Sequence, residues 1–131
     1  MAMRRRFGWW APGVLVAVVL FLVVVRLHPG GAKVGRAVDD VGQLLAAAAA
    51  AAACGSRARR AGSRLGRPWL LLALATGSWA GGELAWSDFE LVAGRQTPFP
   101  SVADAGYLLF AVLAVAGMLL WRSHALRSAL S

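Results

Sequence analysis

Hydrophobic residues fall into four long runs, and these runs predict four membrane-spanning helices. The runs cover residues 9–27, 38–56, 68–92 and 102–121. A helix of about 20 apolar residues is long enough to cross roughly 30 Å of hydrocarbon. Because lipid offers no hydrogen-bond partner to the backbone, even valine-rich segments become helical there. We therefore expect an all-α membrane bundle that forms a single domain over residues 1–131.

The first two runs each allow a second interpretation. Three arginines at residues 4–6 followed by an apolar stretch are also typical of a signal peptide. The stretch is long, however, and residues 30–32 make a poor cleavage site, so we favour an uncleaved span. The second run contains an unbroken alanine tract at 46–53. Such a tract suits a tightly packed helix, and the alternative is a low-complexity linker or surface helix.

Charge indicates the orientation of these spans. Hydrophobic residues make up 59% of the chain and charged residues only 15%, with 14 Lys plus Arg against 6 Asp plus Glu. Arginines gather before the first run, in segment 57–67 and after the last run. The positive-inside rule then predicts cytoplasmic termini, an Arg-rich cytoplasmic loop at 57–67 and an outer loop at 93–101. This pattern indicates a multi-pass protein of the bacterial cytoplasmic membrane, with the lipid bilayer as partner and no nucleic acid.

The third run carries polar side chains at helical spacing. Trp79, Glu83, Trp86 and Glu90 follow the i, i+4, i+7, i+11 pattern, which places them on one face of a helix. Glu83 lies about 22 Å along the helix from Pro68, inside the hydrocarbon. A carboxyl group at that depth is costly, so it suggests a functional site. The alternative is a structural contact between helices, in which protonated Glu83 bonds a neighbouring backbone or Gln43.

A rigid turn separates the third and fourth runs. Pro98, Phe99 and Pro100 stop the helix, and Ser101 suits an N-cap with Asp104 three residues later. Phe99 could pack on the new helix as a hydrophobic staple. The turn would bring polar residues of both helices to one rim of the bundle. The resulting candidate sensing or ligand cluster is Trp79, Glu83, Trp86, Glu90, Asp104 and Tyr107.

These residues carry a resemblance to a known family. The matching positions are Trp79, Gly82, Glu83 and Trp86, then Phe89 and Glu90, then 98–101, Ala103, Asp104, Tyr107 and Leu108. Over about residues 37–120 the chain resembles the N-terminal multi-span input region of actinobacterial GGDEF/EAL cyclic-di-GMP signalling proteins. The resemblance implies a sensory or anchoring module whose output comes from a separate cytoplasmic part. Such regions usually have more spans, and no GGDEF, EAL or PAS segment is present here. We therefore expect a truncated product, a fragment or a stand-alone relative of this family.

Other functions find less support in the sequence. The two histidines, His28 and His124, fall on opposite sides of the predicted bundle, and no catalytic motif is present. We therefore expect no enzyme activity, metal or cofactor. A transporter would need more polar residues than Glu83 along one path. The alternative function is a small structural or partner-binding protein that oligomerises through small residues, with Gly77 and Gly81 as the helix contact.

Overall fold

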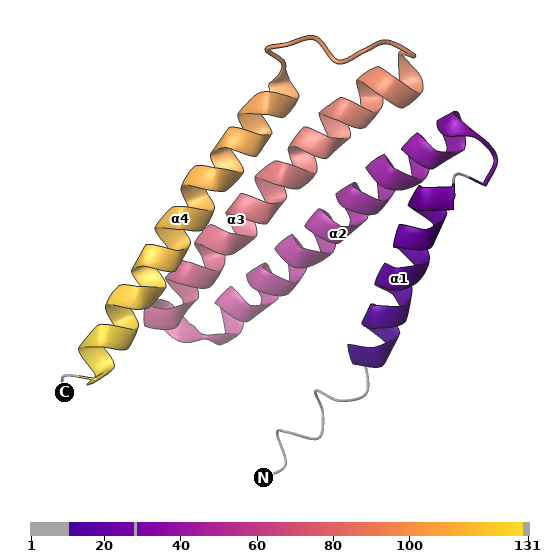
Figure 1. Ribbon diagram of the computed structural model, residues 1–131. Coiled ribbons are helices and arrows are strands. Elements are labelled where there is room, and N and C mark those ends of the chain that lie inside the picture. The colour runs from indigo at the N-terminus through magenta and orange to yellow at the C-terminus, as the bar shows by residue number, and fades with distance from the viewer. Residues whose placement is uncertain (1–10, 28, 130–131) are drawn as a thin grey trace. The chain divides into compact units, whose positions relative to one another are not determined.

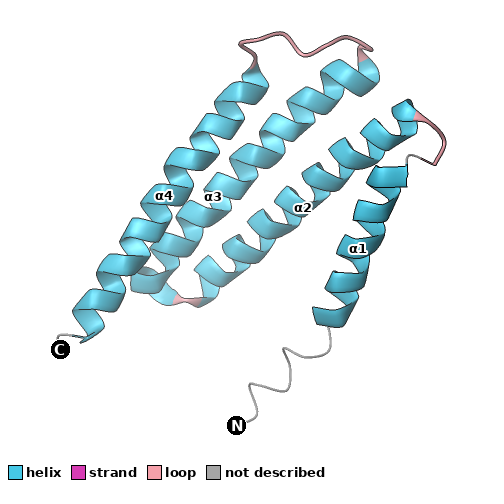
Figure 2. Cartoon of the chain, viewed as in Figure 1, coloured by secondary structure: helices cyan, strands magenta, loops and turns pink. Residues whose placement is uncertain are grey.

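The computed structural model describes residues 11–27 and 29–129. In chain order the elements are α1 (Ala11–Leu27), α2 (Ala32–Arg60), α3 (Gly62–Ser87), the π-helical turn η2 (Asp88–Val92) and α4 (Val102–Ala129), as Figures 1 and 2 show. No strand occurs in the described residues. The prediction of an all-α chain is therefore confirmed.

Two of the described helices are long and apolar enough to cross a membrane. They are Ala32–Arg60 and the Val102–Ser123 part of α4, by length and composition. Helix α1 is apolar but shorter, with 17 residues. Residues 9 and 10 of the predicted first span lie outside the described residues, as do the arginines at 4–6 and His28.

The structure differs most from the predicted boundaries at the Arg-rich segment. A loop over 57–67 was expected, but α2 continues to Arg60 and α3 begins at Gly62. Alanine and arginine are both good helix formers, so the segment stays helical. The turn itself is short: the Ala61 N–H donates to the Arg57 carbonyl at 3.0 Å, and Gly62 has a φ of +71°. That left-handed conformation is a common helix C-terminus for glycine.

Other helix ends also extend past the predicted ones. Helix α2 begins at Ala32 instead of residue 38, and α4 continues to Ala129 instead of 121. Pro68 was expected to open the third helix, but it lies inside α3 and is fully buried. The start of α4 at Val102 agrees with the prediction.

The chain divides into two compact units, 1–42 and 43–131. In the first unit, the Phe21 ring of α1 lies against Gly42 of α2. In the second unit, the later part of α2 meets α3 through small residues. A Cβ placed on Gly77 would lie 3.9 Å from the Ala51 methyl group, which is ordinary van der Waals contact.

Helices α3 and α4 form an antiparallel hairpin with very close backbones (Figure 1). A Cβ on Gly106 would lie 2.7 Å from the Ser78 carbonyl oxygen and 2.9 Å from Gly82 Cα. The buried hydrophobic residues of the described chain are likewise small, namely Ala75, Ala103 and Ala114. Small residues are what allow helices to approach this closely in lipid. The hairpin is the most tightly packed part of the described chain, and it holds the polar residues predicted from the sequence.

Candidate functional site

Glu83 is the centre of a hydrogen-bonded cluster between α3 and α4. Its side chain is 5% exposed. Its Oε1 accepts a hydrogen bond from Trp79 Nε1 at 2.9 Å and another from the Tyr107 hydroxyl at 3.1 Å. Trp79 belongs to α3 and Tyr107 to α4, so one carboxyl oxygen connects the two helices. We call Trp79, Glu83 and Tyr107 the Glu83 cluster.

Local sequence explains this geometry. Trp79 precedes Glu83 by four residues, the spacing that brings two side chains together on a helix. Gly82 leaves room for the partner helix, since a Cβ there would lie 3.0 Å from the Tyr107 ring. The Trp79 ring meets Tyr107 edge-on at 6.0 Å and Phe110 at 4.7 Å between ring centroids. Such edge-to-face pairs add to the stability that burial alone provides.

Asp104 serves as a helix cap, separate from the Glu83 cluster. Its Oδ2 accepts a bond from the Ser101 N–H at 2.6 Å and another from the Ser101 hydroxyl at 3.2 Å. The predicted pairing of Ser101 with Asp104 is therefore present. The predicted staple is wrong, because Phe99 is 89% exposed and does not pack on α4. Pro98 and Pro100 flank it in the non-helical connection, and the Phe99–Pro100 peptide bond is cis.

Trp86 and Glu90 lie further along the same helix and are half-buried. Within the described residues, neither makes a hydrogen bond or ring contact with the Glu83 cluster. For Glu90 the reason lies in η2, where the Ala93 N–H donates to the Asp88 carbonyl five residues earlier. A π-helical turn holds more residues than an α-helical one, so residues after Ser87 leave the face that α-helical spacing predicts.

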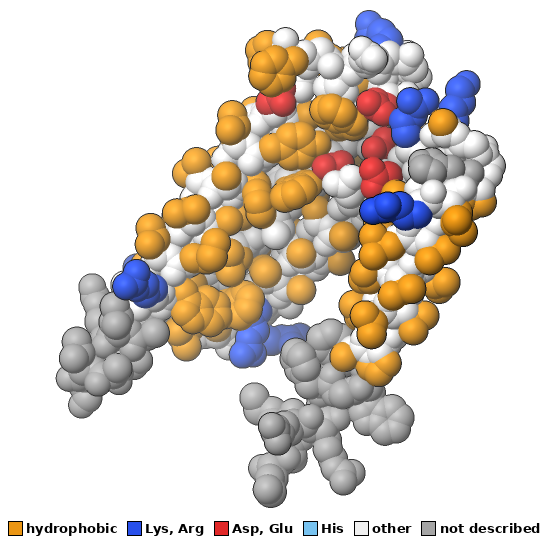
Figure 3. All heavy atoms as spheres, in the orientation of Figure 1, with side chains coloured by type: hydrophobic (Ala, Val, Ile, Leu, Met, Phe, Trp, Pro, Cys, Tyr) orange, Lys and Arg blue, Asp and Glu red, His pale blue; other side chains and the backbone are white. Residues whose placement is uncertain are grey.

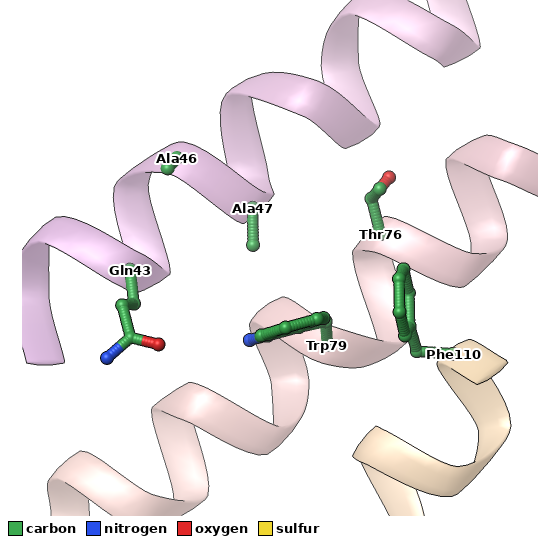
Figure 4. Close-up of a pocket in the computed structure, with 6 residues that line it drawn as sticks. All are labelled: Gln43, Ala46, Ala47, Thr76, Trp79 and Phe110. Carbon is green, nitrogen blue, oxygen red and sulfur yellow. The ribbon is translucent and has the colours of Figure 1, made fainter. Parts of the chain in front are cut away.

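The Glu83 cluster borders an apolar groove of about 300 Å³. Figure 4 shows its lining residues, with the Trp79 indole extending from α3 toward the Gln43 side of the groove. They are Gln43, Ala46, Ala47, Thr76, Trp79 and Phe110. Trp79 therefore contacts both the groove and the buried carboxyl. The sequence interpretation missed Thr76 and Phe110, although their three-residue spacing from Trp79 and Tyr107 could have identified them.

Two further hydroxyl groups are buried without a hydrogen-bond partner in the described chain. They are Ser87 Oγ, near the end of α3, and Thr97 Oγ1, in the following connection. Nothing in the sequence pattern distinguished them from ordinary surface hydroxyls. Burial of an unpaired hydroxyl is unfavourable, so each of the two is available for a hydrogen bond with a polar ligand.

The predicted helix-contact glycines have different surroundings. Gly77 faces Ala51 of α2 within the chain, whereas a Cβ on Gly81 would meet nothing within 4 Å. Among the described residues, no three His, Cys, Asp or Glu side chains are placed to hold a metal ion. The site is therefore a hydrogen-bonded carboxyl beside an apolar groove.

Comparison with protein-family models, with curated proteins and with solved structures gives no match to this chain. The functional inference therefore depends on the geometry of the Glu83 cluster and on the family resemblance of residues 37–120.

Proposed function

We propose that the chain is a membrane-embedded sensory or anchoring module, similar to the input region of cyclic-di-GMP enzymes. It would span the bacterial cytoplasmic membrane four times, with both termini and the α2–α3 turn on the cytoplasmic side. The observation that carries the proposal is the Glu83 carboxyl, buried in α3 and bonded by donors from α3 and α4.

A hydrogen bond between membrane helices is strong enough to favour one packing and weak enough to open. Measured values average about 0.6 kcal/mol and reach about 1.7 kcal/mol. A stimulus that competes for Glu83, or that moves Trp79, would therefore shift the α3–α4 pairing by a similar amount. Such a shift between two packings is what a sensor requires. The groove gives a stimulus direct access to Trp79.

Topology is tested with reporter fusions in living cells. A phosphatase, active only outside the cytoplasm, and a fluorescent protein, active only inside, are each fused after Arg60 and after Gln96. Four spans place Arg60 inside and Gln96 outside. Activity of the same reporter at both positions would contradict this arrangement.

Signalling is tested by grafting. The chain replaces the resembling membrane region of a GGDEF protein, and cellular cyclic di-GMP is measured. We expect Glu83→Gln to change the output because an amide oxygen is a weaker acceptor than the carboxyl oxygen that Trp79 and Tyr107 share. Asp88→Asn is the matched control, since Asp88 is exposed. If Glu83→Gln and Asp104→Asn both left folding, assembly and output unchanged, the sensory site would be abandoned.

One observation favours the alternative, a structural protein that oligomerises. Gly81 has open space where a second helix could approach. Native mass spectrometry of the purified chain distinguishes the two functions. Dimers that are lost in Gly81→Leu and kept in Gly13→Leu, a second glycine with open space, would support the alternative. Monomers alone would exclude it.

A further inference from the structure

One end of the second unit carries arginines and tryptophans. At this end the α2–α3 turn lies beside the later part of α4. A Cβ on Gly66 would lie 2.8 Å from the Ala58 carbonyl oxygen, and the Trp69 and Trp121 rings meet edge-on at 4.8 Å. The residues of this arginine end are Arg57, Arg59, Arg60, Arg67 and Arg122.

All five arginine side chains are exposed. In the described part of the chain, none of them has a carboxylate partner. The acidic residues of the second unit lie toward the opposite end of the α3–α4 hairpin, at Glu83, Asp88, Glu90 and Asp104. From Pro68 to Glu83 alone the separation is about 22 Å of helix. Figure 3 accordingly shows basic side chains, and no acidic ones beside them, near the lower ends of α3 and α4 in that view.

We propose that the arginine end binds the headgroups of anionic phospholipids. Arginine matches phosphate oxygens with two parallel donors, and it stays charged at every physiological pH. Each basic residue near an anionic leaflet adds attraction. The Trp69–Trp121 pair suits the boundary between headgroups and acyl chains, where tryptophan is enriched. The proposal rests on the membrane location proposed above.

A lipid fits this end better than free phosphate does. Next to Trp121 on α4 the apolar side chains are exposed, with Met118 at 59% and Leu119 at 60%. A phospholipid supplies an anion to the arginines and an acyl chain to these side chains. Free phosphate supplies only the anion.

The test titrates the purified full chain in detergent micelles with two lipids of identical acyl chains, phosphatidylglycerol and phosphatidylcholine. Native mass spectrometry gives an apparent Kd for each, and a parallel titration uses inorganic phosphate. We expect phosphatidylglycerol to bind about tenfold more tightly than phosphatidylcholine, as several arginines act together. In the triple variant Arg57→Gln, Arg59→Gln, Arg60→Gln the preference should fall to about twofold. Arg95→Gln, in the connection before α4, is the matched control and should keep the full preference.

Three outcomes would overturn the proposal. The wild type could show no preference for phosphatidylglycerol, Arg95→Gln could lose as much of that preference as the triple variant, or millimolar phosphate could displace the bound lipid. Folding of each variant is checked by far-UV circular dichroism. A second measurement needs no variant: raising salt from about 0.05 to 0.5 M should weaken the wild-type preference several-fold by screening. Extraction of the chain from cell membranes by alkaline carbonate would count against the membrane location alone, because the micelle titration reports lipid preference independently.

Discussion

Helix α1 and the α3–α4 hairpin use apolar residues in opposite ways. None of the described residues of α1 is buried, although valine and leucine surround the helix on all sides. In the hairpin, glycine and alanine lie between the helices, and the buried groups include a carboxyl and a hydroxyl. Apolar side chains are enough to place a helix in lipid, but they do not specify a neighbour. Close packing in lipid requires small residues and hydrogen bonds between helices.

The same difference explains why the most apolar helix of this chain is not the helix with the closest packing. Helix α1 is the most apolar helix, and α3 is much less apolar. Yet α3 makes the most specific contacts of the described helices, through Gly82, Glu83 and Trp79. The small and polar residues that lower the hydropathy of α3 are the residues that contact α4.

Adding a methyl group between α3 and α4 should produce the largest loss in the free energy of unfolding. In Gly106→Ala the new methyl group would meet the backbone of Ser78 and Gly82, and neither can rotate away. We expect a loss of about 3 kcal/mol in the free energy of unfolding, as for overpacked cores. The measurement is SDS titration of the purified chain in mixed micelles, followed by circular dichroism.

Gly81→Ala is the matched control for this prediction. It adds the same methyl group to α3, where nothing lies within 4 Å. Its unfolding free energy should stay the same or rise by up to about 1 kcal/mol, because alanine is the better helix former. Equal losses in the two variants would contradict the packing explanation, because the Gly81 methyl group meets no neighbour and alanine is a better helix former than glycine.

Removing the buried carboxyl should have the next largest effect. Glu83→Ala leaves the Trp79 N–H and the Tyr107 hydroxyl without their acceptor, and we expect a cost of about 2 kcal/mol in the same assay. Glu83→Gln keeps an acceptor oxygen and should cost less than half as much. If the glutamine variant lost as much as the alanine variant, the negative charge would be the stabilising feature, and the hydrogen-bond interpretation would be wrong.

The helix cap provides a smaller effect. Asp104→Ala removes the acceptor of the Ser101 N–H and should cost about 1 kcal/mol, the usual value for a lost cap. Asp88→Ala is the control, because Asp88 is an exposed acid outside the cap. If Asp88→Ala lost as much unfolding free energy as Asp104→Ala, removal of any negative charge at this end would explain both losses. The cap would then contribute nothing specific.

Much of this local structure could be predicted from spacing along the chain. The four-residue step from Trp79 to Glu83 placed both side chains on one helix face, where they form a hydrogen bond. The three-residue step from Ser101 to Asp104 produced the expected capping pair. These contacts depend on one helix turn, so the sequence contains the needed information. Tyr107 could be placed near Glu83 because the connection at 93–101 returns α4 antiparallel to α3.

Contacts that depend on longer-range geometry could not be predicted. The π-helical turn η2 changes the face on which Glu90 lies, and no residue type marks such a turn. Phe99 lies at a sequence position typical of a hydrophobic staple. Its packing, however, depends on the path of the whole connection between α3 and α4, and its side chain is exposed. The arginines of segment 57–67 suggested a loop through their charge, while their helix propensity kept the segment helical.

The smallest effect is expected in α1, and it tests the comparison most directly. Leu15 and Leu20 are 64% and 59% exposed, so their side chains contact little protein. Leu15→Ala and Leu20→Ala should each change the free energy of unfolding by less than about 0.5 kcal/mol in micelles. A buried leucine would lose 2 kcal/mol or more on the same change. A loss of that size in either variant would mean that α1 packs against protein as closely as α3 does, and its uniform apolar surface would then need a partner other than lipid.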